Sequence, residues 1–175
     1  MKNISLSSIV EWLALATDGW KAYLSVDDAR IMTVTLDQLA IGSGLVRMDG
    51  SLQEGEELDP EAYLSDEYLE IFDDEEREAI RRAQKMFFDG DGYRELPGNQ
   101  DFSMLTIMNS FALAYSDQSV RDTLLSALSR SDAAQQFLRS LQGLCIEHEW
   151  CEARDAALRV IARDWCIENH VLFED

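Results

Sequence analysis

The sequence is poor in the residues that interrupt regular structure. Its 175 residues include 2 prolines and 9 glycines, too few for a chain rich in linkers or low-complexity segments. The hydrophobic fraction is 46%, which is typical of globular domains and argues against wholesale disorder. A chain of this length fits one domain, since domains most often contain about 100–150 residues.

Long apolar runs and export features are also missing. The longest stretch without a charged residue runs from Phe102 to Ser116, and a membrane-spanning helix needs roughly 20 apolar residues. The beginning of the chain has no apolar run of the kind found in secretory signals. Three cysteines, Cys145, Cys151 and Cys166, are an odd number and favour free thiols. We therefore expect a cytoplasmic protein that does not contact a membrane.

The residues of common catalytic and metal sites are scarce or wrongly spaced. The chain has two histidines, and Cys145, His148 and Cys151 follow one another at intervals of three, unlike the paired ligands of structural zinc sites. Cys166 lies about 22 Å from Cys151 if both are on one helix. The run at 89–92 resembles the start of a calcium loop, but glycine is missing at the sixth position of that loop. We predict no catalytic residue, no metal site and no cofactor.

Basic residues are few, and most of the charge imbalance lies in one stretch of the chain. The chain has 15 lysines and arginines against 34 acidic residues, for a net charge of −19. From Asp49 to Glu78 there are 14 acidic residues and one basic residue, Arg77, so this stretch carries −13 and the rest of the chain −6. We refer to residues 49–78 as the acidic segment. A surface with this charge repels nucleic-acid phosphates and attracts basic proteins.

The acidic segment has the pattern of an ordered helix. Asp59, Pro60 and Glu61 are typical of a helix start. The apolar residues recur on one helical face: Leu64, Tyr68, Ile71 and Phe72. Tyr63 and Leu69 fall off that face, where exposure would allow self-association. We predict that the apolar face docks on the domain, while acids opposite form a partner surface. Its candidate residues are Glu61, Asp66, Glu67, Glu70, Asp73 and Asp74.

The first part of the chain predicts one helix and a small β-hairpin. Ser8 and Glu11 have the spacing of a capping box at the start of the helix. Residues 20–25 and 30–35 are rich in β-branched and aromatic side chains and predict the two strands. A short capped helix follows at 35–42.

Helical patterns predominate after the acidic segment. Asp73 with Glu76 opens a helix whose buried face includes Ile80, Ala83 and Phe87. A short edge strand at 93–96 and four further helices follow. The third of these helices is broken at Gly143, and the last runs from about 147 to 168, with Asn169 ending it in the left-handed conformation.

The sequence thus predicts an α+β, mainly α fold, with an N-terminal helix and hairpin followed by a multi-helix bundle. We expect a single domain over residues 1–175. It has a helix–hairpin part at 1–48, the acidic segment at 49–78 and a helical body at 79–175.

One arginine falls on an apolar helix face. At 100° per residue, Arg154 lies in the middle of the face that contains Trp150 and Trp165. A guanidinium buried there needs a carboxylate or carbonyl partner. Glu95, Asp101 or an acid of the acidic segment would serve. Two interpretations stay open: Arg154 is a structural tether, or it anchors a ligand together with the two tryptophans.

The C-terminal helix also carries a motif that can be compared with known families. The motif comprises Glu149-Trp150, Arg154-Asp155-Ala156-Ala157-Leu158, Ile161-Ala162, Trp165-Cys166 and Glu168-Asn169, with Phe137-Leu138 and Tyr93-Arg94-Glu95-Leu96-Pro97 upstream. It resembles uncharacterised protein family 158, a bacterial family. The resemblance does not extend to residues 42–70. It implies a small bacterial cytosolic protein and brings no known activity.

Two functions stay open. The first is a non-enzymatic binding or regulatory protein whose acidic segment contacts a basic protein, in its sharper form by mimicking nucleic-acid phosphate. Direct binding of nucleic acid is not expected, because the charge has the wrong sign. The second is an enzyme of unknown class that uses carboxylates and Arg154 in a cleft. The acidic run also has a simpler explanation, a solvated surface that keeps the chain in solution.

Overall fold

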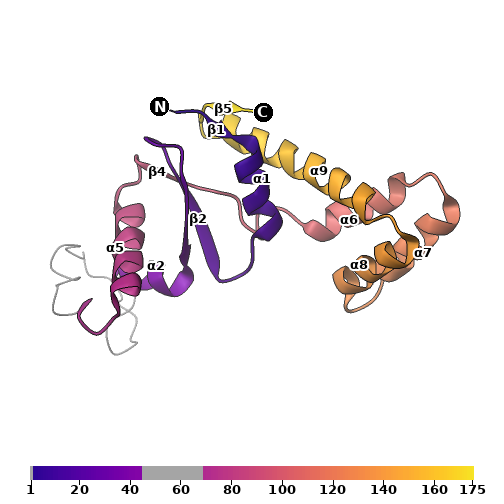
Figure 1. The fold of residues 1–175 in the computed structure, drawn as a ribbon, viewed down its shortest axis with the longest axis horizontal. Coiled ribbons are helices and arrows are strands. Elements are labelled where there is room, and N and C mark those ends of the chain that lie inside the picture. The colour runs from indigo at the N-terminus through magenta and orange to yellow at the C-terminus, as the bar shows by residue number, and fades with distance from the viewer. Residues whose placement is uncertain (1, 45–68) are drawn as a thin grey trace. The chain divides into compact units, whose positions relative to one another are not determined.

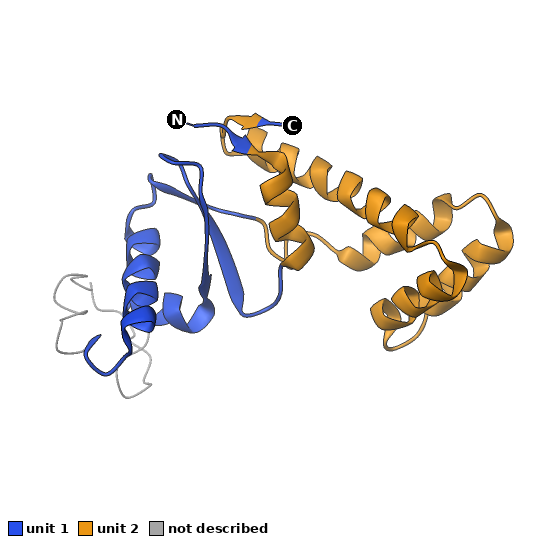
Figure 2. Ribbon diagram, viewed as in Figure 1, with its two compact units in different colours: residues 1–4, 16–96, 174 blue, residues 5–15, 97–173, 175 orange. Residues whose placement is uncertain are grey.

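The computed structural model describes residues 2–44 and 69–175 of the chain. They form two compact units, coloured separately in Figure 2. Apart from a few terminal residues, unit 1 contains residues 16–96, and unit 2 contains residues 5–15 and 97–173. Helices predominate beside a small sheet, so the predicted α+β, mainly α fold is confirmed. The prediction of a single domain stays a prediction.

In its described residues, unit 1 combines an antiparallel sheet with two helices (Figure 1). The strands are β2 (Trp20–Ser25), β3 (Ile31–Thr35) and β4 (Tyr93–Glu95), in the order β3-β2-β4. The helices are α2 (Leu36–Gly42) and α5 (Asp74–Phe88). The predicted hairpin is therefore present, and β4 lies at an edge of the sheet, as predicted.

Helices α2 and α5 each begin with a capping box, at the positions predicted. The Thr35 side chain accepts a hydrogen bond from Gln38 N at 3.1 Å, and Thr35 N donates to Gln38 Oε1 at 3.0 Å. Asp73 Oδ1 accepts from Glu76 N at 2.8 Å, and Asp73 N donates to Glu76 Oε2 at 3.4 Å. These reciprocal bonds satisfy donors that the first turn of a helix leaves without a partner.

The two helices of unit 1 approach closely at a glycine. A Cβ atom added to Gly42 would lie 2.7 Å from Gln84 N and 3.0 Å from Ile80 O, both backbone atoms of α5. Such an approach requires a residue without a side chain. On α5, Met86 is 3% exposed and Phe87 is 48% exposed. The predicted burial of Phe87 is therefore wrong, because the buried face of α5 continues from Ile80 and Ala83 to Met86.

Unit 2 is built from helices (Figure 1). They are α1 (Leu6–Leu15), α6 (Met104–Ala114), α7 (Gln118–Leu128), α8 (Ala133–Leu144) and α9 (Glu147–Glu168). Helix α9 contacts α1, α6 and α8, and α7 lies against α6 and α8. Two short strands, β1 (Ile4–Ser5) and β5 (Phe173–Glu174), pair with each other.

Three helix boundaries differ from those predicted. Helix α1 already begins at Leu6, so Ser8 lies inside it and the predicted capping box with Glu11 is wrong. Gly143 lies within α8, and the left-handed residue after that helix is Cys145, at φ 56°. After α9 it is His170, at φ 55°, and not Asn169.

The core of unit 2 is centred on aromatic rings. Phe137 and Trp150 are 0% and 4% exposed, and their ring centroids lie 5.1 Å apart in an edge-to-face arrangement. Phe111 adds a third ring, 5.4 Å from Trp150. Edge-to-face pairs contribute about 0.5–1.5 kcal/mol beyond the burial of their area. This cluster fixes α6, α8 and α9 against one another.

None of the helices in residues 2–44 and 69–175 combines the length and apolar character that crossing a membrane requires.

Candidate functional site

The predicted partner surface lies partly within the described residues. Glu70 lies in the turn before α5, and Asp73 and Asp74 lie at the start of this helix; all three are exposed. Glu61, Asp66 and Glu67 lie outside the described residues, as do Tyr63, Leu64 and Tyr68. The described part of the predicted surface is therefore the end of the acidic segment, residues 69–78.

The end of the acidic segment is held by apolar contacts. Leu69 is 0% exposed and forms a cluster with Ile80, against which Ile41 and Phe72 also pack. The prediction that Phe72 docks on the domain is confirmed. Two neighbouring predictions are wrong: Leu69 is buried, and Ile71 is 66% exposed. The chain turns at residues 70–72, and this turn breaks the helical register from which both were placed.

An arginine also fastens this turn. Arg77 lies in the second turn of α5, and its Nη2 donates to Phe72 O at 3.0 Å. The same atom lies 3.5 Å from Asp74 Oδ1. One guanidinium therefore binds a carbonyl of the acidic segment and one of its carboxylates, so that the path of residues 72–77 is tied to α5.

The acids of this surface serve the helix as well as any partner. Asp73 caps α5, and Asp74, Glu75 and Glu76 occupy its first turn. Carboxylates there are favoured by the helix dipole, by about 0.3–1 kcal/mol each at exposed positions. Asp73 and Glu76 are engaged with each other, whereas Asp74 has a side chain that is 99% exposed. Glu75 and Glu78 are also exposed.

Within residues 69–78, the exposed carboxylates other than the capping pair are Glu70, Asp74, Glu75 and Glu78, of which Asp74 also lies 3.5 Å from Arg77 Nη2. We call these four residues the α5 acidic surface. Glu75 and Glu78 were absent from the predicted set. The sequence could have indicated both residues, because they lie within the acidic segment. An acidic residue in the first turns of a helix points outward if it neither caps the helix nor faces the core.

The residues of the second predicted site, Trp150, Arg154 and Trp165, differ in their burial. Trp150 is 4% exposed within the aromatic core, and Trp165 is 8% exposed. Arg154 binds the neighbouring Asp155, with Nε and Nη2 at 2.9 Å and 2.8 Å from the same carboxylate oxygen. Its side chain is 29% exposed. The expectation of a buried guanidinium is wrong, because Arg154 reaches past the apolar face to an acid beside it.

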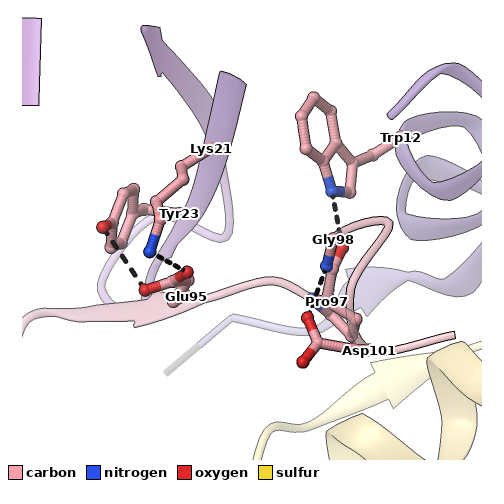
Figure 3. A network of polar contacts seen from close by, with 7 residues as sticks. All are labelled: Trp12, Lys21, Tyr23, Glu95, Pro97, Gly98 and Asp101. Carbon is pink, nitrogen blue, oxygen red and sulfur yellow. Dashed lines mark hydrogen bonds and ion pairs between the residues drawn. The ribbon is translucent and has the colours of Figure 1, made fainter. Parts of the chain in front are cut away.

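Two of the partners expected for Arg154, Glu95 and Asp101, are engaged elsewhere, as Figure 3 shows. Within unit 1, Glu95 accepts a hydrogen bond from Lys21 Nζ at 2.6 Å and one from Tyr23 OH at 3.4 Å. Within unit 2, Asp101 Oδ2 accepts from Gly98 N at 2.8 Å. Glu95 is therefore part of a cross-strand cluster and Asp101 closes a local turn.

The Glu95 cluster has the properties of a structural group. Tyr23 and Glu95 are paired across β2 and β4, which places their side chains on one face of the sheet. Burial, aided by the nearby Glu95 carboxylate, raises the pKa of Tyr23 to about 12. A phenol with this pKa stays protonated near neutral pH and donates a hydrogen bond, so it is unsuited to act as a base.

Unit 2 carries a polar groove between α7 and α8, with a volume of about 750 Å³. Asp122 and Arg130 are its charged lining residues. Thr123 and Ser140 also line it, and each donates its hydroxyl hydrogen to a carbonyl of its own helix. The lining contains neither Arg154 nor a second carboxylate. It therefore lacks the pair of carboxylates that the enzyme hypothesis requires.

The thiols occupy three different environments. Cys145 is exposed, Cys151 is half-buried and Cys166 is buried, and all three are free. Burial raises the pKa of Cys166 to about 11, which suppresses the reactive thiolate. Within the part of the chain that the structure describes, no group of three or more histidine, cysteine, aspartate or glutamate side chains is arranged to hold a metal ion.

Comparisons with known proteins add no further assignment. No family model, no curated protein and no solved structure matches the chain. The resemblance to uncharacterised protein family 158 therefore rests on the sequence motif alone.

Proposed function

We propose that the chain is a non-enzymatic binding or regulatory protein that recognises a basic protein through its acidic segment. The concentration of charge carries this proposal, since 14 acids and one base lie between Asp49 and Glu78. In its sharper form, the acidic segment mimics nucleic-acid phosphate and occupies the binding surface of a DNA- or RNA-binding protein. We also propose a cytoplasmic location, which the odd number of cysteines supports because it favours free thiols.

The geometry of the described end supports this function over a merely solvating role. A surface that only keeps a protein in solution needs no fixed arrangement of its charges. Here Leu69 is fully buried and Arg77 binds Phe72 O, so the α5 acidic surface starts from an anchored turn. Fixed carboxylates lose less conformational entropy when a partner binds them than a mobile chain does.

A pull-down comparison tests the proposal. The test variant Glu70→Gln/Asp74→Asn/Glu75→Gln/Glu78→Gln removes four charges and keeps the capping pair Asp73 and Glu76. The control variant removes four exposed acids from other parts of the chain: Glu11→Gln, Asp18→Asn, Glu147→Gln and Glu168→Gln. Both variants have the same net charge, so they differ only in where the charge is removed.

We expect wild type and control to capture the same basic protein from cell lysate at low salt, and the test variant to lose it. Duplex DNA added to the lysate should compete if the partner is a nucleic-acid-binding protein. Recovery of identical proteins with all three baits would overturn the proposal. If both variants lost the partner equally, the interaction would depend on the net charge of the protein and not on the α5 acidic surface, which would also contradict the proposal.

A further inference from the structure

Helix α9 has an exposed face opposite its buried side. Its buried residues share one side of the helix: Trp150, Leu158, Ala162, Trp165 and Cys166. On the opposite side, Ala156 is exposed, Val160 is 56% exposed and Ile167 is 59% exposed. With Ala153, these residues follow one another at helical spacings of three, four and seven, and so share one stripe. We call this stripe the α9 outer face.

Charges border the α9 outer face in an ordered way. Glu149 and Glu152 lie at its N-terminal end, and Arg159 and Arg163 lie toward its C-terminal end. The glutamates and Arg163 are exposed, and the side chain of Arg159 is 40% exposed. The glutamates make the N-terminal end of the stripe negative. Toward the C-terminal end, Arg159 and Arg163 border one side of the stripe and the exposed Asp164 borders the other.

This order is self-complementary in an antiparallel arrangement. Ala156 is seven residues after Glu149 and seven before Arg163, which is about 10.5 Å along the axis in each direction. Two copies of α9 related by a two-fold axis at Ala156 therefore bring Glu149 level with Arg163 of the second copy. Glu152 comes level with Arg159 to within one residue.

The apolar residues fit the same arrangement. Ala156 would meet its own equivalent at the axis, where a small side chain lets two helices approach to about 8–10 Å. Val160, four residues after Ala156, comes level with Ala153, three residues before it. Each contact occurs twice, as in any interface in which both copies use the same surface.

Contacts within unit 2 hold the charged groups in place. Asp175 Oδ1 lies 3.1 Å from Arg163 Nη2 and 3.8 Å from Arg159 Nη1. Two guanidinium groups share this one carboxylate, so positive charge remains for another partner. Tyr115 OH donates to Glu149 Oε2 at 2.6 Å, and a carboxylate retains further acceptor positions after one such bond.

We propose that the α9 outer face is a docking surface for a second copy of this chain, which makes the protein an antiparallel homodimer. Two charge pairs favour this occupant, because Glu149 and Glu152 of each copy come level with Arg163 and Arg159 of the other. The net charge of −19 on each copy opposes association. At about 0.15 M salt the screening length is about 8 Å, which weakens this long-range repulsion more than contacts at the interface.

Sedimentation velocity of the full chain over a concentration series tests the dimer. We expect the wild type to sediment as a dimer and Val160→Glu to raise the dimer Kd at least about tenfold, because it places two like charges in the seam. Leu138→Glu is the matched control. Leu138 is 46% exposed on α8, outside the outer face, and its substitution should leave the Kd unchanged. Circular dichroism verifies that both variants are folded.

A charge exchange tests the antiparallel register. Glu149→Arg and Arg163→Glu should each weaken the dimer, and the double variant should restore it, because each arginine then again faces a glutamate of the second copy. A monomeric wild type at the highest concentration would overturn the proposal. So would a dimer that survives Val160→Glu, or a double variant no stronger than the single ones.

Discussion

Replacing Gly42 by alanine tests the close contact between α2 and α5. The new methyl group would lie 2.7 Å from Gln84 N, 3.0 Å from Ile80 O and 3.1 Å from Ala83 C. All three are backbone atoms and cannot rotate away. Favourable contacts between non-bonded heavy atoms lie near 3.5–4.0 Å, so the two helices must separate by about 1 Å.

Two opposing effects determine whether Gly42→Ala raises or lowers the free energy of unfolding. Alanine is favoured over glycine inside a helix by about 1 kcal/mol. Overpacking a well-filled contact costs about 1–3 kcal/mol. We expect the second effect to win, so that Gly42→Ala lowers the free energy of unfolding by up to about 2 kcal/mol. The separation would also loosen the contacts of Leu69 and Ile41 beside the glycine.

Gly143→Ala is the matched control. Gly143 lies near the C-terminal end of α8, as Gly42 does in α2, and a Cβ there meets nothing within 4 Å. This variant should gain up to about 1 kcal/mol from helix preference. Urea unfolding followed by circular dichroism measures both changes, and amide hydrogen exchange assigns each to its own unit. A Gly42→Ala variant stabilised as much as Gly143→Ala would refute the close approach.

Four further predictions follow from individual side chains. Leu69→Ala should lower the free energy of unfolding by about 2–5 kcal/mol. Ile71→Ala, at a site that is 66% exposed, should change it by less than about 0.5 kcal/mol. Equal effects of the two variants in chemical denaturation would contradict the burial of Leu69. Arg154→Ala should cost at most about 1 kcal/mol, because its partner Asp155 is 50% exposed; a loss of several kcal/mol in the same assay would reveal a buried partner. In the folded protein at pH 8, a thiol reagent should label the exposed Cys145 quickly. Cys166 should stay unlabelled until urea unfolds the chain, because burial shields it and raises its pKa to about 11. Mass spectrometry of the labelled peptides measures both reactions. The pKa of Tyr23 in the folded protein is about 12, above its ordinary value of 10.0, so its contribution to stability should be complete below pH 10 and decline as the pH rises toward 12. The difference in absorbance between wild type and Tyr23→Phe detects this late titration. A transition centred near pH 10 would argue against the buried phenol.

Local signals in the sequence predicted the elements well. The capping boxes at Thr35 and Asp73 depend on side chains three residues apart, and both are present. The hairpin and α9 also follow from short-range patterns. Such features are readable because their atoms are close in the chain as well as in space.

Contacts between residues far apart in the chain could not be predicted from the sequence. Lys21 and Glu95 are bonded although they lie far apart in the chain, and no local pattern marks such a pair. Arg154 was placed by helical periodicity, which gives the direction of the Cβ atom but not where a long side chain ends. Its guanidinium turned to Asp155, the nearest carboxylate. Leu69 was misplaced because one helical register was extended across a turn.

Binding to a basic ligand is the property that tests the central claim most directly. An NMR titration of the isotopically labelled chain with a lysine- and arginine-rich peptide maps the contact residue by residue. We expect amide shift changes to concentrate on Glu70, Asp74, Glu75 and Glu78, and to vanish in 0.5 M salt, where the screening length falls to about 4 Å. Shift changes spread evenly over exposed acids such as Glu11, Glu147 and Glu168 would contradict a dedicated acidic surface.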